Sequence, residues 1–197
     1  MNSDSLFHIL SNEKFLRMEG LGNEVPFFVH TYDIADQVAV YTRLKELVNR
    51  LETSGVRPLL ISLYDMVIEH FQEAGELEDL FAFEQTVSKE EFRAEMHSYT
   101  NPESLLRPYF ASRMKEDDFQ LIVVYQVGEV FPFMRTHNVL NNLQTVVTDR
   151  PLVVFFPGTY ETSPEQGFKL SLFGKFPGPY YRAFKLEDYV IRGNINA

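Results

Sequence analysis

Residues 121–125 have the sequence Leu-Ile-Val-Val-Tyr, and residues 151–156 have the sequence Pro-Leu-Val-Val-Phe-Phe. The run Pro58-Leu-Leu-Ile-Ser-Leu63 has the same apolar character. Continuous apolar runs of this length are typical of strands in a parallel sheet that helices cover on both faces. The three runs therefore predict mostly parallel, buried strands, with residues 121–125 as the clearest central strand.

Other elements are predicted around these strands. Residues 25–29 predict a further strand, and Pro26 indicates that it lies at the beginning of that strand or at a sheet edge. Apolar residues at helical spacing predict an amphipathic helix that ends before Gly55: Val40, Tyr41, Leu44, Leu47, Val48 and Leu51. The order of strand, helix, strand, several helices, strand, helix, strand and strand predicts an α/β fold with a mostly parallel central sheet.

Two segments extend this pattern. Residues 65–118 are too long for one crossover helix, and they predict an acidic helical insertion. Residues 168–186 predict a β-arm followed by a last strand. A length of 197 residues suits one ordinary domain, so we expect residues 1–197 to form a single α/β domain.

The chain is acidic, and its charge is uneven. It has 28 acidic and 18 basic residues, and 22 of the acids lie in residues 1–118. Such a surface repels a phosphate backbone, so we do not expect direct DNA binding. The acidic stretch predicts either a solvated face or a docking face for a basic partner. The absence of cysteine, of a secretory signal and of a long apolar run predicts a cytoplasmic protein with no membrane span.

Familiar catalytic motifs are missing from the sequence. The spacing from Gly167 to Gly174-Lys175 is wrong for a phosphate loop, and there is no G-x-S-x-G motif of a serine hydrolase. The five histidines are scattered without metal-ligand spacing. We therefore expect no enzyme activity, no cofactor and no metal.

An alternative site is formed by three acids that follow predicted strands. Asp33, Asp65 and Glu129 would lie at the carboxyl edge of the sheet, where α/β proteins collect their ligands. They could act as magnesium ligands or bases in a metal- or nucleotide-dependent enzyme. They could equally cap the helices that follow, because a helix N-terminus favours negative charge.

Two stretches stand out as candidate partner-binding surfaces. Residues 127–143 predict a turn, framed by Gly128 and Pro132, into a helix that runs to about Val147, with Glu129 near its positive end. Residues 168–184 interleave aromatic and basic residues, which suits a protein interface, an inward-packed arm or, more weakly, single-stranded nucleic acid. The candidate residues are Gly128, Glu129, Arg135, His137, Asn138, Asn142, Phe173, Lys175, Tyr180, Tyr181 and Arg182.

Several motifs resemble those of the BrxB family of bacteriophage exclusion (BREX) systems. They are Gly20-Leu-Gly-Asn-Glu-Val-Pro-Phe27, Val127-Gly-Glu-Val-Phe-Pro-Phe133 with Arg135, His137 and Leu140-Asn-Asn-Leu-Gln144, Val154-Phe-Phe-Pro-Gly-Thr-Tyr160, Leu170-Ser-Leu-Phe-Gly174 and Tyr180-Tyr-Arg-Ala-Phe184. The element order also resembles Rossmann-like and nucleoside-triphosphatase folds without a phosphate loop, which is an analogy of fold alone.

The family resemblance implies a cytoplasmic component of a system that methylates host DNA and blocks unmodified phage. It implies other BREX proteins as partners, with PglZ first, then PglX and BrxC, and it leaves room for a homo-oligomer. The family supplies no catalytic residue to transfer to this chain. We therefore expect a non-catalytic assembly or adaptor subunit that acts through protein contacts.

Overall fold

The computed structural model describes residues 1–19, 26–115, 118–163, 167–180 and 183–191. Its sheet contains a parallel part with strand order β2-β3-β4-β1-β7, and β4 continues into an antiparallel part with β5 and β6. The strands are β1 (Phe27–Tyr32), β2 (Pro58–Ser62), β3 (Leu121–Tyr125), β4 (Leu152–Ser163), β5 (Gly167–Leu172), β6 (Phe176–Tyr180) and β7 (Phe184–Lys185). The predicted α/β class with a mostly parallel sheet is confirmed.

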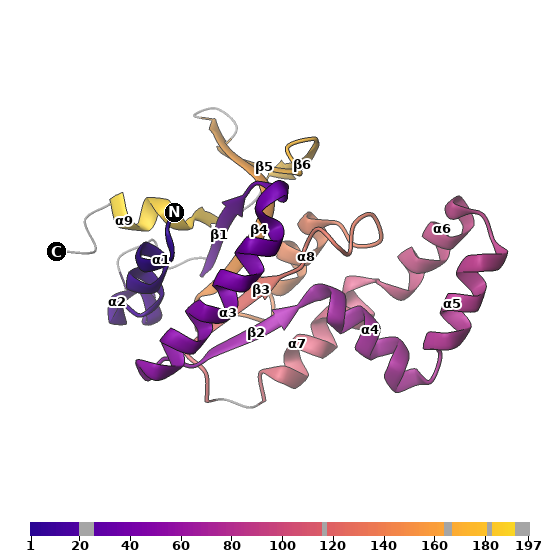
Figure 1. The fold of residues 1–197 in the computed structure, drawn as a ribbon, viewed down its shortest axis with the longest axis horizontal. Coiled ribbons are helices and arrows are strands. Elements are labelled where there is room, and N and C mark those ends of the chain that lie inside the picture. Colours follow the sequence, from indigo (N-terminus) through magenta and orange to yellow (C-terminus); the bar gives the residue numbers. More distant parts are fainter. Residues whose placement is uncertain (20–25, 116–117, 164–166, 181–182, 192–197) are drawn as a thin grey trace.

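Helices connect and cover these strands (Figure 1). They are α1 (Ser3–Leu10), α2 (Glu13–Leu16), α3 (Gln37–Thr53), α4 (Leu63–Ala74), α5 (Leu77–Thr86), α6 (Lys89–Tyr99), α7 (Arg107–Arg113), α8 (Thr136–Leu143) and α9 (Leu186–Ile191). Two short turns of other helical type precede α3 and α7, at Ile34–Asp36 and Pro102–Leu106. Within the described parts of the chain, no helix is both long and apolar enough to cross a membrane.

The two faces of the sheet carry separate apolar layers. Along β3, Leu121 and Val123 pack with α1 and α3, whereas Ile122 and Val124 pack with α4, α7 and α8. Each of these four side chains is at most 1% exposed. A strand that is buried on both faces needs apolar residues at every position, which explains the continuous run in the sequence.

The predicted helical insertion corresponds to α4–α7. Figure 1 shows α5 and α6 at one end of the molecule, away from the sheet. A capping box is present at the start of α6, where Ser88 and Glu91 hydrogen-bond to each other's backbone. No described residue of α5 is fully buried, and Phe81 of this helix is 44% exposed.

Two predicted boundaries are wrong at β4 and α8. The apolar run predicted a strand over residues 151–156, whereas β4 begins at Leu152 and continues through Gly158 to Ser163, where it pairs with β5. An added Cβ at Gly158 would lie 2.1 Å from the carbonyl oxygen of Ser171, so the close approach of the two strands requires glycine there.

The helix predicted to run from Pro132 to about Val147 is shorter, since α8 spans only Thr136–Leu143. Residues 127–133 form turns, and the Phe131–Pro132 peptide bond is cis. The aromatic side chains of this segment pack outside the helix, with Phe133 against Phe92 of α6 and Phe131 against Phe176 of β6. These long-range contacts outweigh the local helical spacing. Pro26 indicated either the beginning of a strand or a strand at the sheet edge. The edge placement is wrong, because β1 lies between β4 and β7.

Candidate protein-binding groove

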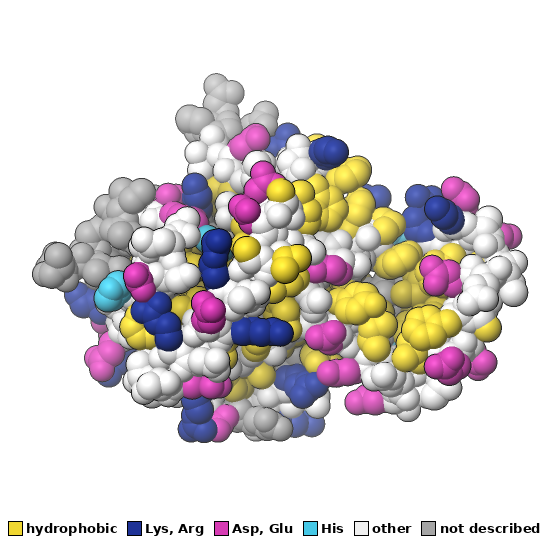
Figure 2. Space-filling view, in the orientation of Figure 1, with side chains coloured by type: hydrophobic (Ala, Val, Ile, Leu, Met, Phe, Trp, Pro, Cys, Tyr) yellow, Lys and Arg dark blue, Asp and Glu magenta, His cyan; other side chains and the backbone are white. Residues whose placement is uncertain are grey.

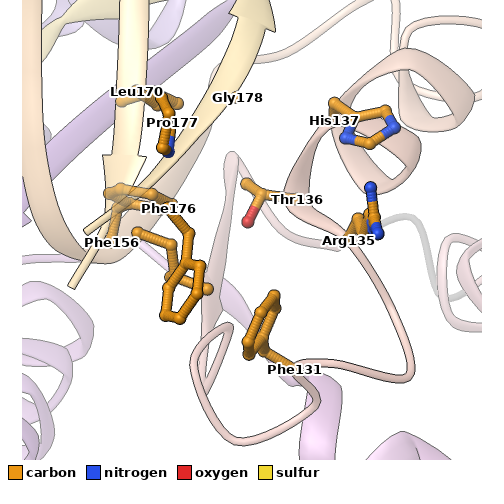
Figure 3. Close-up of a pocket in the computed structure, with 10 residues that line it drawn as sticks. Phe131, Arg135, Thr136, His137, Phe156, Leu170, Phe176, Pro177 and Gly178 are labelled. Atoms are coloured by element: carbon orange, nitrogen blue, oxygen red, sulfur yellow. The ribbon is translucent and has the colours of Figure 1, made fainter. Parts of the chain in front are cut away.

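The two stretches that the sequence singled out meet in space. The turn before α8 and the β5–β6 hairpin enclose a cavity of about 220 Å³ (Figure 3). Its lining residues are Phe131, Arg135, Thr136, His137, Phe156, Leu170, Leu172, Phe176, Pro177 and Gly178. We call this cavity the hairpin groove.

One wall of the hairpin groove is aromatic. The rings of Phe131 and Phe176 lie 4.9 Å apart, and Phe173 packs edge-on against both, at 6.2 and 6.4 Å between ring centroids. Phe176 remains 48% exposed despite these contacts. Figure 2 shows apolar side chains gathered on the surface where the hairpin meets the turn before α8. Exposed apolar clusters of this kind mark interaction sites on soluble domains.

The opposite wall is formed by the start of α8. Figure 3 shows Arg135 and His137 across the cavity from Phe156 and Phe176, with Thr136 between them. Arg135 is exposed, and within the described part of the chain its guanidinium has no hydrogen-bond or ion-pair partner. Burial lowers the pKa of His137, and the neighbouring positive charge of Arg135 lowers it further.

Gly128 supports the groove from behind. A Cβ at this position would lie 2.8 Å from the ring of Phe173 and 3.0 Å from Pro157. The turn therefore packs directly on the hairpin because residue 128 has no side chain. This contact assigns Gly128 and Phe173 to the support of the groove.

Glu129 faces a different environment. Its Oε1 accepts a 2.7 Å hydrogen bond from the hydroxyl of Tyr41, which in turn lies 3.3 Å from the hydroxyl of Tyr32. Burial and the hydrogen bonds of this network raise the pKa of Tyr41, and burial raises that of Tyr32 to about 12. Glu129 thus joins α3 to the turn after β3, and the predicted placement beside the positive end of α8 is wrong.

The other candidate residues occupy varied positions. Lys175 is exposed in the hairpin turn, and Asn138 is exposed on α8. The side-chain amide of Asn142 donates to the carbonyl of Asn138, so it stays on its own helix. Tyr181 and Arg182 lie outside the described residues, as does the side chain of Tyr180.

The structure does not assemble the three predicted carboxylates. Asp33 is exposed and accepts a hydrogen bond from the backbone of Ala35, as the capping alternative expects. Asp65 is exposed in the first turn of α4, whereas Glu129 is bound to Tyr41. Among the described residues, no three His, Cys, Asp or Glu side chains are placed so that they could hold a metal ion.

Sequence reasoning missed two features of this edge of the sheet. Thr136 lines the hairpin groove, although nothing in its local sequence distinguishes it. Gln126 adopts a left-handed backbone with φ of 57°, and its side chain hydrogen-bonds to Ser62 at the end of β2. The left-handed backbone conformation is strained for a residue other than glycine. The hydrogen bond to Ser62 that accompanies it is a tertiary contact, which the sequence alone does not reveal.

Comparisons with known proteins agree with the motifs. The family model described as "BREX protein BrxB" matches residues 59–186, which include β3–β7 and the whole hairpin groove. The BREX protein BrxB of Bacillus cereus (strain H3081.97) is 32% identical over 94% of this chain and 95% of that protein. The BREX protein BrxB of Escherichia coli O9:H4 (strain HS) is 26% identical over 90% of this chain and 86% of that protein. No solved structure matches the chain significantly. The chain therefore belongs to the BrxB family of bacteriophage exclusion proteins.

Proposed function

We propose that this protein is a non-catalytic assembly or adaptor component of a BREX complex. In this role it supports host DNA methylation and phage restriction by binding other BREX proteins. The first expected partner is PglZ, and PglX and BrxC are further candidates.

The hairpin groove is the observation that supports this proposal most. It combines a half-exposed phenylalanine, Phe176, with an exposed and unpaired arginine, Arg135, within the described residues. Aromatic residues and arginine are enriched in protein interfaces, and arginine is also enriched among their hot spots. The groove also lies inside the segment that the BrxB family model matches.

The aromatic residues of the arm favour a protein partner over single-stranded nucleic acid. Phe173 and Phe176 pack against Phe131, so their faces are partly occupied within the chain. A stacking platform for successive bases presents free aromatic faces along a basic groove. In the described hairpin, exposed Lys169 and Lys175 are the only basic residues.

Pull-down from cells that express the complete BREX system tests the proposal. We expect tagged wild-type protein to retain PglZ, and Phe176→Ser to retain much less. Phe81→Ser is the matched control, because Phe81 is 44% exposed against 48% for Phe176 but lies on α5, away from the hairpin. Failure of every BREX protein to co-purify with the wild type would contradict the proposal.

A further inference from the structure

We propose that the hairpin groove binds the C-terminal residue of a partner protein, with its apolar side chain on the aromatic wall and its carboxylate at the start of α8. This inference rests on the proposed function and adds the chemistry of the bound group.

The cavity is small. Its volume of about 220 Å³ lies below the ~300–1,000 Å³ of sites that hold drug-sized ligands and cofactors. It therefore suits one amino-acid residue better than a dinucleotide or a similarly large cofactor. An occupant of this size must satisfy both walls at once.

The two walls call for different chemical groups. Phe131, Phe156 and Phe176 offer apolar surface, whereas Arg135 offers a positive charge that has no partner among the described residues (Figure 3). The described lining contains no Asp or Glu that would repel an anion. The best occupant is thus an apolar group with a negative charge close to it.

The side chain of Thr136 independently supports a hydrogen-bond acceptor as the bound group. It is 8% exposed, and within the described part of the chain its hydroxyl has no hydrogen-bond partner. Figure 3 shows its oxygen directed into the cavity, between the aromatic wall and Arg135. The hydroxyl is not among the fully enclosed unpaired atoms of the described residues, so it faces the cavity and can donate a hydrogen bond to an acceptor on a ligand.

The backbone at the start of α8 favours the same group. Arg135 occupies the N-cap position of this eight-residue helix, and it makes no side-chain capping hydrogen bond. The amides of Asn138 and Val139 bond to the carbonyl of Arg135, whereas those of Thr136 and His137 have no partner among the described residues. Uncapped amides and the helix dipole both favour an anion at this point.

A chain end meets these requirements in one residue. Its side chain and its terminal carboxylate are attached to the same Cα, so a short cavity can receive both. An internal segment would need an acidic residue next to an apolar one, with the chain leaving the cavity at both ends. Capture of a C-terminal carboxylate by backbone amides is a recurring form of peptide recognition.

N-acetyl-L-phenylalanine and its neutral counterpart N-acetyl-L-phenylalaninamide are the probes. Each is titrated to ~20 mM into the ¹⁵N-labelled full-length chain, since ligands of this size bind with a Kd on the order of 1 mM. We expect the acid to bind about tenfold more tightly than the amide, since a charge-assisted bond replaces a neutral one. The shifted amides should include those of Thr136, His137 and Gly178.

Two variants assign the binding to named groups. Thr136→Val keeps the shape but removes the hydroxyl, and Arg135→Gln removes the charge from an exposed side chain. Each should weaken the acid about three- to tenfold and leave the amide nearly unchanged. Arg135→Gln keeps the test decisive if Thr136→Val fails to fold.

Several outcomes would overturn the inference. They are equal binding of acid and amide, no binding of either up to ~20 mM, and tighter binding of adenosine monophosphate at the same amides. If BREX partners co-purify with the wild type while the acid fails to bind, this inference fails and the adaptor proposal stands. If the acid binds but no BREX protein co-purifies, the adaptor proposal fails.

Discussion

The hydroxyl of Tyr41 in α3 donates a 2.7 Å hydrogen bond to Oε1 of Glu129, in the turn that follows β3. The other oxygen of Glu129 is buried and has no partner among the described residues. Among the described residues, the hydroxyl of Tyr41 is therefore the hydrogen-bond donor that offsets the burial of this carboxylate. The contact makes Glu129 a structural residue that fixes the turn leading to the hairpin groove.

Tyr41→Phe should therefore lower the free energy of unfolding by about 1–3 kcal/mol, because it leaves the buried carboxylate without its donor. Urea unfolding measures the change. Tyr64→Phe is the control, since Tyr64 is 44% exposed and its hydroxyl has no partner in the described residues. Equal effects of the two substitutions would show that the Tyr41–Glu129 contact contributes nothing.

Glu187 should make the free energy of unfolding depend on pH. Burial alone would raise its pKa, but the hydrogen bond with His30, 2.8 Å away, and further favourable contacts lower it overall. A lowered carboxyl pKa stabilises the folded state above the unfolded value of about 4.3, and this stability is lost as the pH falls from there through the folded value.

Unfolding of wild type and Glu187→Gln at several pH values tests this coupling. The wild type should lose more stability than the variant when the pH falls from about 6 to below 4. Parallel pH profiles for the two proteins would rule out a role of Glu187 in joining α9 to β1.

Three glycines predict a graded effect on the hairpin. Gly158→Ala should be the most damaging, because the new Cβ would lie 2.1 Å from the backbone oxygen of Ser171. Gly128→Ala should be milder, since its nearest neighbour is the movable ring of Phe173 at 2.8 Å. Gly174→Asn should change stability least, because nothing lies within 4 Å and asparagine tolerates its φ of 67°. Thermal unfolding that ranks them differently would contradict the packing of turn and hairpin.

The pKa of His137 reports directly on its neighbour Arg135. NMR titration should place it below the ordinary value of about 6.5, since burial and then the charge of Arg135 disfavour the protonated ring. Arg135→Gln should raise it towards that value. An unchanged pKa in the variant would mean that the guanidinium does not lie near the ring.

The sequence predicted those elements that depend on local pattern. Continuous apolar residues identified β3, and helical spacing together with Gly55 identified α3. The failures occurred where distant contacts decide. The helix was predicted to begin near Pro132, yet Phe131 and Phe133 pack against the hairpin and α6, and α8 begins only at Thr136. β4 continues past Pro157 because it pairs in parallel with β1 up to that residue and then antiparallel with β5. Neither pairing can be read from the local sequence.

The candidate site shows the same division. Composition identified both stretches that form the hairpin groove, because aromatic and basic residues are unusual side by side. Their meeting in one cavity is a property of the fold, since Arg135 and Phe176 are far apart in the chain. The sequence could not show that Asp33, Asp65 and Glu129 do not form one site, because a carboxylate after a strand either caps a helix or faces a ligand.

Calorimetric titration of the purified protein with purified PglZ measures whether the hairpin groove binds this partner. We expect wild type and Phe81→Ser to bind with similar affinity, whereas Phe176→Ser should bind at least about tenfold more weakly, a loss of about 1.4 kcal/mol or more, with its melting temperature nearly unchanged. Equal binding by all three proteins, or no heat of binding for the wild type, would contradict this expectation.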